Sequence, residues 1–253
     1  MQRHYLYIEH KIPERHTRIN SDALFFGAHP DDVELNCGGT LISLVNAGRK
    51  IVIADLTRGE LSTRGTLRIR EKETRAASEA MGISFRENLG LRDGGIKNDD
   101  ASRLKIVRVI RKHRPDIVFA PYPHDRHPDH IHAGELIRDA VFLSGLEKIV
   151  TAGLRSHRPS RTFYYRSASD IPVSFVFDIS GTFDKKIEVL KCYRSQFHDP
   201  QSGEPETFIS SKLFWHEIES RARHFGFKIG AEFGEPFCCF ETLKGGPATV
   251  FSL

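Results

Sequence analysis

Short apolar runs alternate with helix-like segments along most of the chain. The run Leu24–Ala28 ends in small residues, as a buried strand does before a loop, and the runs Ile51–Leu56 and Ile117–Ala120 have the same character. Segments of helical composition follow these runs, and we expect helices at 38–47, 68–81, 102–113 and 129–142. Strands that alternate with helices are typical of βαβ units. The chain is therefore expected to fold as an α/β protein with a Rossmann-like, mostly parallel sheet flanked by helices, and with its site at the carboxyl ends of the strands.

The remaining segments fit one domain. We expect strands near 162–165 and 173–178 and helices near 185–193 and 211–224. A chain of 253 residues is of ordinary length for a single α/β domain. The first twenty residues are polar and lack a clean period. We therefore expect a poorly ordered leader at 1–20 and a single domain at 21–253.

The composition is that of an ordinary globular protein, with 39% hydrophobic and 28% charged residues. No stretch approaches the roughly 18 apolar residues of a membrane helix, and no apolar run follows a basic start as in a signal peptide. We therefore expect a cytoplasmic protein with no membrane partner. The four cysteines show no CxxC pair, which favours buried free thiols in a reducing compartment over a soft-metal site at Cys238 and Cys239.

The formal net charge of +4 is modest for this length. Basic residues gather at 103–114, where apolar residues recur at helical spacing, so these lysines and arginines are expected on the solvent face of a helix. No RNA- or DNA-binding motif accompanies them. The sequence therefore argues against a nucleic-acid partner.

Two clusters rich in histidine and aspartate follow two of the expected strands. The first, His29 to Glu34, reads HPDDVE and comes directly after the first apolar run. The second, His124 to His130, reads HDRHPDH and follows the run Ile117–Ala120. Since ligands in open α/β sheets bind outside the carboxyl ends of strands, both clusters are expected at the same sheet edge. Each alone could be turn chemistry or helix capping, but the two together predict a metal site.

Hydrolysis at such a metal needs two kinds of carboxylate. Two histidines and one carboxylate would bind the metal and leave a position for water, and a second carboxylate nearby would take a proton from that water. Adjacent aspartates such as Asp31 and Asp32 can divide these tasks, because successive side chains in a turn point in different directions. A histidine held by a carboxylate can stabilise the oxyanion that forms. His127 with Asp129 fits this description, which leaves His130 for the metal.

The two clusters resemble the signatures of the LmbE-like, or PIG-L, family of zinc-dependent N-acetylglucosamine deacetylases. The motif AHPDD at 28–32 and the motif HPDH at 127–130 match the family's two signatures, and the similarity extends from about Leu24 to Phe237. Within the family the sequence looks most like the deacetylases of bacillithiol biosynthesis. The stretches that support this branch are 27–34, 55–57, 61–62, 65–66, 88–89, 125–130 and 193–197.

The resemblance implies a role for each residue of the two motifs. The implied metal ligands are His29, Asp32 and His130. The metal in the family is zinc, although ligands of this kind also accept iron. Asp31 would be the general base, and His127, oriented by Asp129, would support the oxyanion.

Further residues resemble positions that contact the substrate. Arg70 and Asp93 match family positions that grip the sugar, although Arg70 could equally be a helix-surface charge and Asp93 a turn residue. Arg126 or Arg58 would suit an acidic group of the substrate. Tyr193 resembles a residue near the pocket. The segment 198–207 differs from the family pattern in the region that shapes the pocket rim, so the sequence defines the reaction better than the substrate.

The leading hypothesis is a metal-dependent hydrolase that acts on a small amino-sugar molecule, N-acetylglucosaminyl malate, in bacillithiol biosynthesis. The alternative within this chemistry is another N-acetyl sugar, such as a glycan, a lipid or an antibiotic conjugate. A nonhaem iron oxygenase could use the same ligands, but Asp31 and the pair of His127 and Asp129 favour hydrolysis. No GxGxxG motif follows the first strand, which argues against a nicotinamide-dependent dehydrogenase. A sugar-binding module without activity would not need a base and three ligands together.

The phenylalanines near the C-terminus bear on assembly. They are expected to belong mostly to the core, with an interface between copies as the alternative. Relatives in the family often form homo-oligomers, and the resemblance implies the same here. These residues are Phe225, Phe227, Phe233, Phe237 and Phe240.

Overall fold

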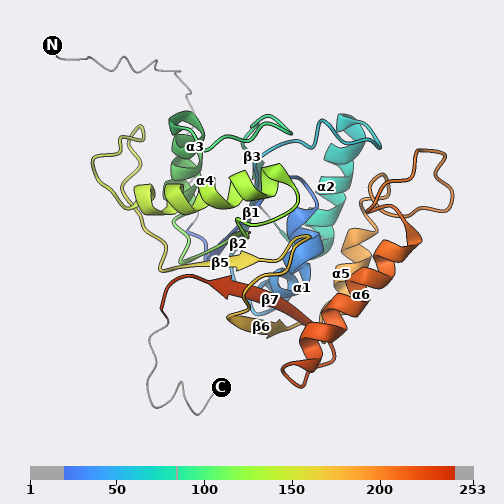
Figure 1. Cartoon of the computed structure of the whole chain (residues 1–253). Helices are drawn as coiled ribbons and strands as arrows, with labels where there is room; N and C mark the ends of the chain where they lie inside the picture. The colour runs from blue at the N-terminus through green and yellow to red at the C-terminus, as the bar shows by residue number, and fades with distance from the viewer. Residues whose placement is uncertain (1–19, 84, 243–253) are drawn as a thin grey trace.

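A computed structural model describes residues 20–83 and 85–242, and one sheet contains all seven strands found there (Figure 1). The strands are β1 (Ala23–Gly27), β2 (Ile51–Asp55), β3 (Phe85–Asn88), β4 (Ile117–Pro121), β5 (Arg161–Tyr165), β6 (Phe175–Asp178) and β7 (Gly234–Cys239). Their order across the sheet is β3-β2-β1-β4-β5-β7-β6. The first five in this order are parallel, whereas β7 runs antiparallel to both of its neighbours. The expected mostly parallel α/β sheet is therefore confirmed; the expected leader, apart from Asn20, lies outside the described residues.

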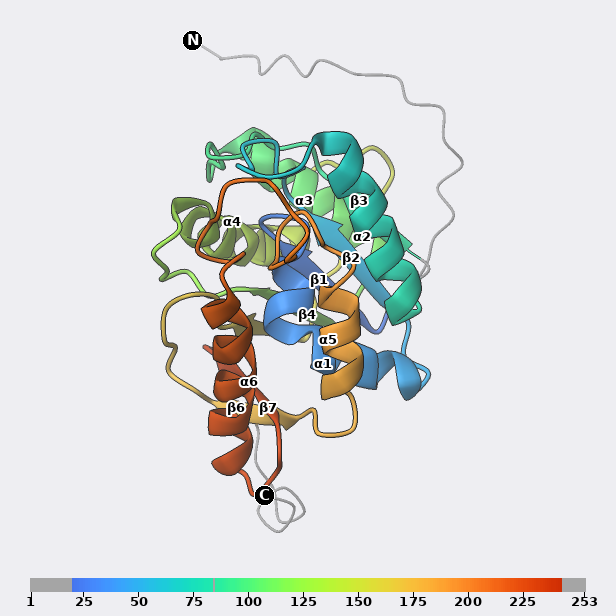
Figure 2. The ribbon, with the colours of Figure 1, turned by 90° about the vertical axis from the view of Figure 1, so that its right-hand side faces the viewer.

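Helices cover both faces of the sheet (Figures 1 and 2). They are α1 (Asp32–Asn46), α2 (Leu67–Met81), α3 (Asp100–His113), α4 (Pro128–Ser144), α5 (Phe183–Leu190) and α6 (Lys212–Phe227). Within the described part of the chain, no helix combines the length and the apolar composition that a membrane crossing requires. α3 packs against α4 on one face, and α1 packs against α5 on the other.

The central strands contribute to two hydrophobic cores. Phe25 and Phe119 belong to the core beneath α1 and α5, whereas Leu24 and Phe26 belong to the core beneath α3 and α4. Because both faces of the sheet are covered, every residue of β1 is buried. This double burial explains why the strand reads as a continuous apolar run and lacks polar alternation.

The first helix begins earlier than the sequence suggested. We expected it from Gly38, but α1 begins at Asp32 and contains Gly38 and Gly39, with a local departure from helical geometry at Cys37. A Cβ atom at Gly39 would lie only 2.8 Å from the side chain of Ile179, just before α5. The glycine therefore permits a close approach between two segments, and it does not mark a helix start.

The edge strand β3 was not predicted. It reads FREN, which is neither a continuous apolar run nor an alternation of apolar and polar residues, the two patterns that predict a strand. The side chain of Arg86 is only 8% exposed, and its guanidinium donates two hydrogen bonds to Asp55, at 2.7 and 2.9 Å, and one to Glu34 at 2.5 Å. Charge pairing inside the fold, which no local pattern reveals, thus holds this strand in place.

The strand β7 was also missed, because we expected its aromatic residues in the core, or at an interface as the alternative, and did not assign them to a strand. Three of the five phenylalanines there, Phe225, Phe233 and Phe237, are buried as expected. The other two are not: Phe227 is 85% exposed and Phe240 is 51% exposed. The four cysteines are free thiols, as predicted, but only Cys37 and Cys238 are buried, whereas Cys192 and Cys239 are partly exposed.

One arginine of the basic segment does not face solvent. Arg111 in α3 is buried, and its guanidinium donates to the carbonyl oxygens of Ser144, Leu146 and Ile149 at 3.0, 2.7 and 2.6 Å. These carbonyls lie at the end of α4 and just beyond it, where backbone oxygens lack helical partners. The predicted solvent position is therefore wrong for Arg111, which ties α3 to the end of α4.

A buried ion pair joins the last strand to two helices. Lys186 of α5 donates to Glu235 of β7 at 2.7 Å, and both side chains are almost wholly buried. Glu235 also accepts hydrogen bonds from the backbone of Gly39 and from Thr40 in α1. The carboxylate is thus fully partnered, as a buried charge has to be.

We expect Lys186→Met to lower the free energy of unfolding by about 3–5 kcal/mol, because the substitution leaves the charge of Glu235 buried without its partner. Chemical denaturation would measure the loss. Lys185→Met on the same helix is the control, since Lys185 pairs with Glu188 at the exposed surface, and it should change stability by less than about 1 kcal/mol. Equal losses in the two variants would show that the buried pair does not secure β7.

Candidate active site

The two clusters meet at the centre of the sheet. β1 and β4 are neighbours, and the chain leaves them in opposite directions across the sheet, since α1 leads to β2 and α4 leads to β5. Such a switch point opens a crevice outside the carboxyl ends of the two strands. Residues that follow β1 and β4 line a cavity of about 560 Å³ there. The prediction that both clusters lie at one sheet edge is therefore confirmed.

Three side chains from the clusters present metal-binding atoms to one point. These atoms of His29, Asp32 and His130 all lie within 4.8 Å of one another. Nδ1 of His29 lies 3.4 Å from Oδ2 of Asp32, and Nε2 of His130 lies 3.3 Å from Oδ1 of the same carboxylate. Two imidazole nitrogens and a carboxylate suit zinc and also iron(II). The residues present therefore fit the expected metal.

Each of the two histidines has a carboxylate beside its other ring nitrogen. Nε2 of His29 lies 3.1 Å from Oδ1 of Asp93 and 3.3 Å from Oδ2 of Asp129. Nδ1 of His130 lies 3.4 Å from Oδ1 of Asp125. Carboxylates commonly orient metal-binding histidines in this way. The arrangement leaves Nδ1 of His29 and Nε2 of His130 to bind the metal.

The buried carboxylates also shift the pKa values of these histidines. Burial alone would lower the pKa of His130, but the carboxylates of Asp32 and Asp125 raise it to about 9. Burial likewise opposes a charge on His29, whose pKa nevertheless lies well above its ordinary value because of hydrogen bonds to three carboxylates. The surrounding negative charge thus stabilises positive charge at this point, which is what a divalent cation needs.

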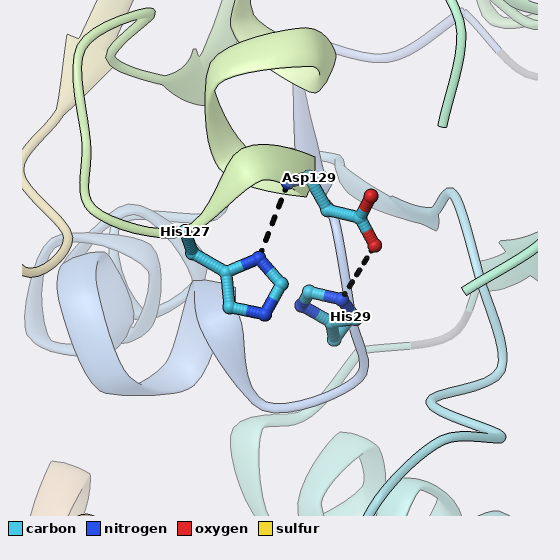
Figure 3. A group of neighbouring side chains, drawn as sticks. All are labelled: His29, His127 and Asp129. Atoms are coloured by element: carbon cyan, nitrogen blue, oxygen red, sulfur yellow. Dashed lines mark hydrogen bonds and ion pairs between the residues drawn. The ribbon is translucent and has the colours of Figure 1, made fainter. Parts of the chain in front are cut away.

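A second set of ligand atoms, from His29, His127 and Asp129, also lies within 4.8 Å (Figure 3). The two sets share His29, so they cannot both be filled in full. The oxygens of Asp129 are committed elsewhere, because they accept hydrogen bonds from the N–H groups of Gly94 at 2.7 Å and Ile96 at 3.3 Å. We therefore assign the metal to the set that contains Asp32, and Asp129 to the orientation of His29.

The contacts of His127 correct one prediction. We expected the carboxylate of Asp129 to orient its ring, but the backbone N–H of Asp129 donates to Nδ1 of His127 at 3.2 Å, and the carboxylate turns to His29 (Figure 3). His127 is the N-cap of α4, where the first backbone N–H groups have no helical partner. A ring that accepts at Nδ1 carries its proton on Nε2. His127 lines the cavity and therefore offers a neutral N–H donor there.

The two adjacent aspartates diverge, as expected. Asp31 has a backbone φ of 108°, which residues other than glycine rarely adopt. Its buried carboxylate accepts a hydrogen bond from Nη1 of Arg70 at 2.6 Å, whereas Asp32 belongs to the ligand set. Burial raises the pKa of Asp31 to about 6 in spite of Arg70. Asp31 thus lines the cavity as a carboxylate outside the ligand set, as a general base must.

The two residues predicted to grip the sugar line the cavity and also support the catalytic groups. Nη1 of Arg70 donates to the carbonyl oxygen of Pro30 at 3.1 Å as well as to Asp31, so the guanidinium fixes the loop after β1. Asp93 accepts a hydrogen bond from Leu61 N–H at 2.8 Å in addition to its contact with His29. Contact of either residue with a sugar stays a prediction.

Tyr193 is not where the resemblance implied. Its side chain is 0% exposed and is absent from the cavity wall, and its hydroxyl donates to Oε1 of Glu34 at 2.7 Å. The guanidinium of Arg70 lies 5.9 Å from the centre of its ring. The only polar atom of the Tyr193 side chain is therefore bonded inside the core and does not face a substrate. Tyr193 instead supports the site from behind, through the contact of its ring with Arg70.

The two arginines suggested for an acidic group differ in position. Arg126 lines the cavity and is exposed, with its guanidinium 4.2 Å from the centre of the Phe208 ring. Arg58 pairs with Glu71 on the exposed face of the neighbouring segment and is absent from the cavity wall. Only Arg126 of these two thus lines the cavity, and its contact with an acidic group stays a prediction.

Two groups of cavity residues were not singled out from the sequence. Asp125 is the first: Oδ1 accepts from His127 N–H and Oδ2 from Ala168 N–H, both at 2.8 Å. Asp125 belongs to the second cluster, so its position among the histidines could have identified it as a site residue. The second group, which no local motif marks, is Arg166, Glu217 and Arg221 from the loop after β5 and from α6.

Comparison with known proteins assigns the chain to a family. Residues 24–141 match the model of the PIG-L family, described as GlcNAc-PI de-N-acetylase. Diacetylchitobiose deacetylase from Thermococcus kodakarensis is 35% identical over 184 residues, which are 67% of this chain and 67% of that protein. The probable N-acetyl-alpha-D-glucosaminyl L-malate deacetylase 2 from Bacillus cereus is 31% identical over 181 residues, which are 66% of this chain and 80% of that protein.

A solved structure has the same fold over most of the chain. A conserved protein from Thermus thermophilus superposes with a TM-score of 0.81 and 37% identity, and the match covers 90% of this chain and 98% of that one. The two relatives named above are both deacetylases of N-acetyl sugars. These similarities show that the chain belongs to the PIG-L, or LmbE-like, family of deacetylases.

Proposed function

We propose that this protein is a zinc-dependent hydrolase that removes the acetyl group from an N-acetylglucosaminyl conjugate, with N-acetylglucosaminyl malate as the leading substrate. One observation carries the proposal: Asp31 lines the cavity next to the ligand set of His29, Asp32 and His130 without belonging to it. The relatives support the type of reaction, and the Bacillus cereus protein supports the malate conjugate.

The cavity residues divide the work of amide hydrolysis. Zinc in the ligand set would supply a water of lowered pKa and would polarise the acetamido carbonyl. Asp31 takes the proton from the attacking water, since Arg70 holds its carboxylate in the cavity wall. Nε2 of His127 donates a hydrogen bond to the carbonyl oxygen as negative charge develops on it.

The second half of the reaction returns the proton. When the bond between the carbonyl carbon and the sugar nitrogen breaks, the leaving nitrogen needs a proton, and Asp31 holds the one that it took from water. The oxygen of that water leaves in the acetate, and the sugar leaves with a free amine. One carboxylate therefore serves as base and then as acid.

Two other functions compete with this proposal. The 35% identity to a diacetylchitobiose deacetylase favours an N-acetylated disaccharide as the second candidate substrate. A nonhaem iron oxygenase shares the ligand types, but it would have no use for Asp31 or for the N–H donor of His127. Turnover without oxygen would separate the oxygenase from either hydrolase.

The release of primary amine tests the proposal directly. Zinc-loaded protein is incubated with N-acetylglucosaminyl malate, with diacetylchitobiose and with free N-acetylglucosamine. Fastest release from the malate conjugate supports the leading substrate, and fastest release from the disaccharide replaces it with the second candidate. No release from any of the three, with metal bound, would refute the proposed reaction on these sugars.

We expect Asp31→Asn to lower kcat by about 10²–10⁴-fold, because general acid–base groups contribute rate factors of this size. The amide still accepts a hydrogen bond from Arg70, so the fold and the bound zinc should be retained. Zinc stoichiometry and the melting temperature are measured beside the rate. Activity close to that of the unmodified protein would remove Asp31 from the mechanism.

We expect Asp125→Asn to weaken zinc binding by about 10–100-fold, because the variant loses the carboxylate that backs His130. Competition with a chelator measures the affinity. Asp139→Asn in α4 is the matched control, since Asp139 pairs with Asn98 and Arg103 outside the cavity, and it should bind zinc normally. Equal affinities in the two variants would show that Asp125 does not tune the metal site.

A further inference from the structure

Three charged side chains share one part of the cavity wall. Arg166 follows β5, and Glu217 and Arg221 lie one turn apart on α6, which packs against β7 (Figure 1). Within the described residues, none of their hydrogen bonds or ion pairs involves a metal ligand. In this triad, the two guanidinium groups face the carboxylate of Glu217. Arg166 also donates to Asp170 at 3.1 Å, but the side chain of Asp170 is 92% exposed, so solvent screens that pair. The proposed mechanism gives the triad no task.

The pairing inside this triad is loose. Nη1 of Arg166 and Nη1 of Arg221 both lie 3.7 Å from the same oxygen, Oε1 of Glu217, which is beyond hydrogen-bond distance. The guanidiniums are fixed by the backbone, because both donate to the carbonyl oxygen of Ser167, at 2.9 and 3.2 Å. Their side chains are only 14% and 13% exposed. Glu217 therefore forms no hydrogen bond with either guanidinium, and it is the only ion-pair partner of Arg221 among the described residues.

Unpartnered buried atoms gather at the same place. Nη2 of Arg221, Oε2 of Glu217 and Oγ of Ser167 are each buried and make no hydrogen bond to the described residues. Buried polar atoms in proteins are nearly always partnered, so these three atoms need polar partners from outside the chain, either ordered water or a ligand. Burial also lowers the pKa of Arg221, a sign that its charge is incompletely balanced by the protein.

A second cavity adjoins this triad from behind. It measures about 470 Å³, and Arg166, Glu217 and Arg221 line both cavities. Lys228 and His224 also line it, whereas Asp170 pairs with Arg166 at 3.1 Å. Arg166 and Arg221 therefore lie between the two cavities, and the backbone holds them beside any ligand in the active-site cavity.

We infer that Arg166 and Arg221 form a subsite for one carboxylate or similar monoanionic group on the aglycone of the substrate. The inference rests on the proposed function, and it selects acidic conjugates of N-acetylglucosamine within it. With the substrate bound, two guanidiniums would face two carboxylates, that of Glu217 and that of the ligand, and Nη2 of Arg221 would gain the acceptor that it lacks among the described residues. Guanidinium groups suit this task because their paired N–H donors match the two oxygens of a carboxylate.

Matched acidic and neutral substrates test the subsite. N-acetylglucosaminyl malate is compared with its dimethyl ester, which has the same sugar and linkage without the charge. Arg221→Gln should lower kcat/KM for the acid by roughly 10- to 100-fold, through a higher KM, because one charge-assisted hydrogen bond is lost. The same variant should change kcat/KM for the ester by less than about twofold. Arg166→Gln should act in the same direction.

Two further variants separate recognition from damage to the fold. Arg223→Gln on the same helix is the control, since Arg223 pairs with Glu219 and Glu232 at the surface, and it should keep the preference for the acid. Glu217→Gln should tighten binding of the acid by removing the competing carboxylate, an effect that loosened packing would not produce. An unchanged preference in both Arg166→Gln and Arg221→Gln would overturn the subsite and leave the proposed function intact.

A direct binding measurement tests the subsite even if the proposed function is wrong. If neither compound releases amine, calorimetry on the metal-free protein compares their affinities, since the triad does not include a metal ligand. Tighter binding of the acid that Arg221→Gln abolishes supports the subsite on its own. Equal affinities for the acid and the ester would overturn it.

Discussion

The adjacency of β1 and β4 is the constraint on which the rest of the site depends. Parallel strands whose following helices lead away on opposite sides leave their loops apart, and nothing fills the gap between them. The loops also start two helices, since Asp32 is the first residue of α1 and His127 is the N-cap of α4. Helix N-termini carry partial positive charge and free N–H groups. The carboxylates of this crevice, and the oxyanion formed during hydrolysis, are therefore placed where the backbone favours negative charge.

Asp31 and Asp32 show how the loop after β1 separates two neighbouring carboxylates. A φ of 108° at Asp31 costs about 1–3 kcal/mol, and such strain persists only where the surroundings fix the chain. Arg70 does so by holding both the carboxylate of Asp31 and the carbonyl of Pro30. The result is one carboxylate on the metal side and one off it. The strained backbone thus provides the division of tasks that amide hydrolysis requires.

A buried charge network supports this loop from behind. Arg86 on β3 pairs with Asp55 on β2 and with Glu34 on α1, and Glu34 also accepts the hydroxyl of Tyr193. The ring of Tyr193 in turn lies against Arg70. Strands and helices far apart in the sequence are joined in this way to the guanidinium that holds Asp31. Edge strand β3, which has no apolar pattern, belongs to the fold because of this network.

Local patterns predicted what depends on local chemistry. The apolar runs predicted four of the five parallel strands, β1, β2, β4 and β5, and the two clusters contain the candidate ligand set, because these residues lie within a few positions of a strand end. The carboxylate of Asp129 turned to His29 and not to its neighbour His127, since a helix N-cap uses backbone groups that a sequence motif does not display. Tyr193 was misplaced for a related reason: its partner Glu34 lies 159 positions away.

Residues near a motif and residues far from one also differ in their proposed roles, the first in the reaction and the second in substrate selectivity. All the residues assigned to the metal and to proton transfer lie within 24–141, the part of the chain that matches the family model. Arg166, Glu217 and Arg221 lie beyond it. Arg166 directly follows β5, and Glu217 and Arg221 lie on α6, which packs against β7. A wall built from a separate part of the chain can change its charge without disturbing the metal or the base. The proposed substrate selectivity of this protein therefore depends on residues that no motif marks, and among them on Arg221, whose Nη2 has no partner in the described part of the chain.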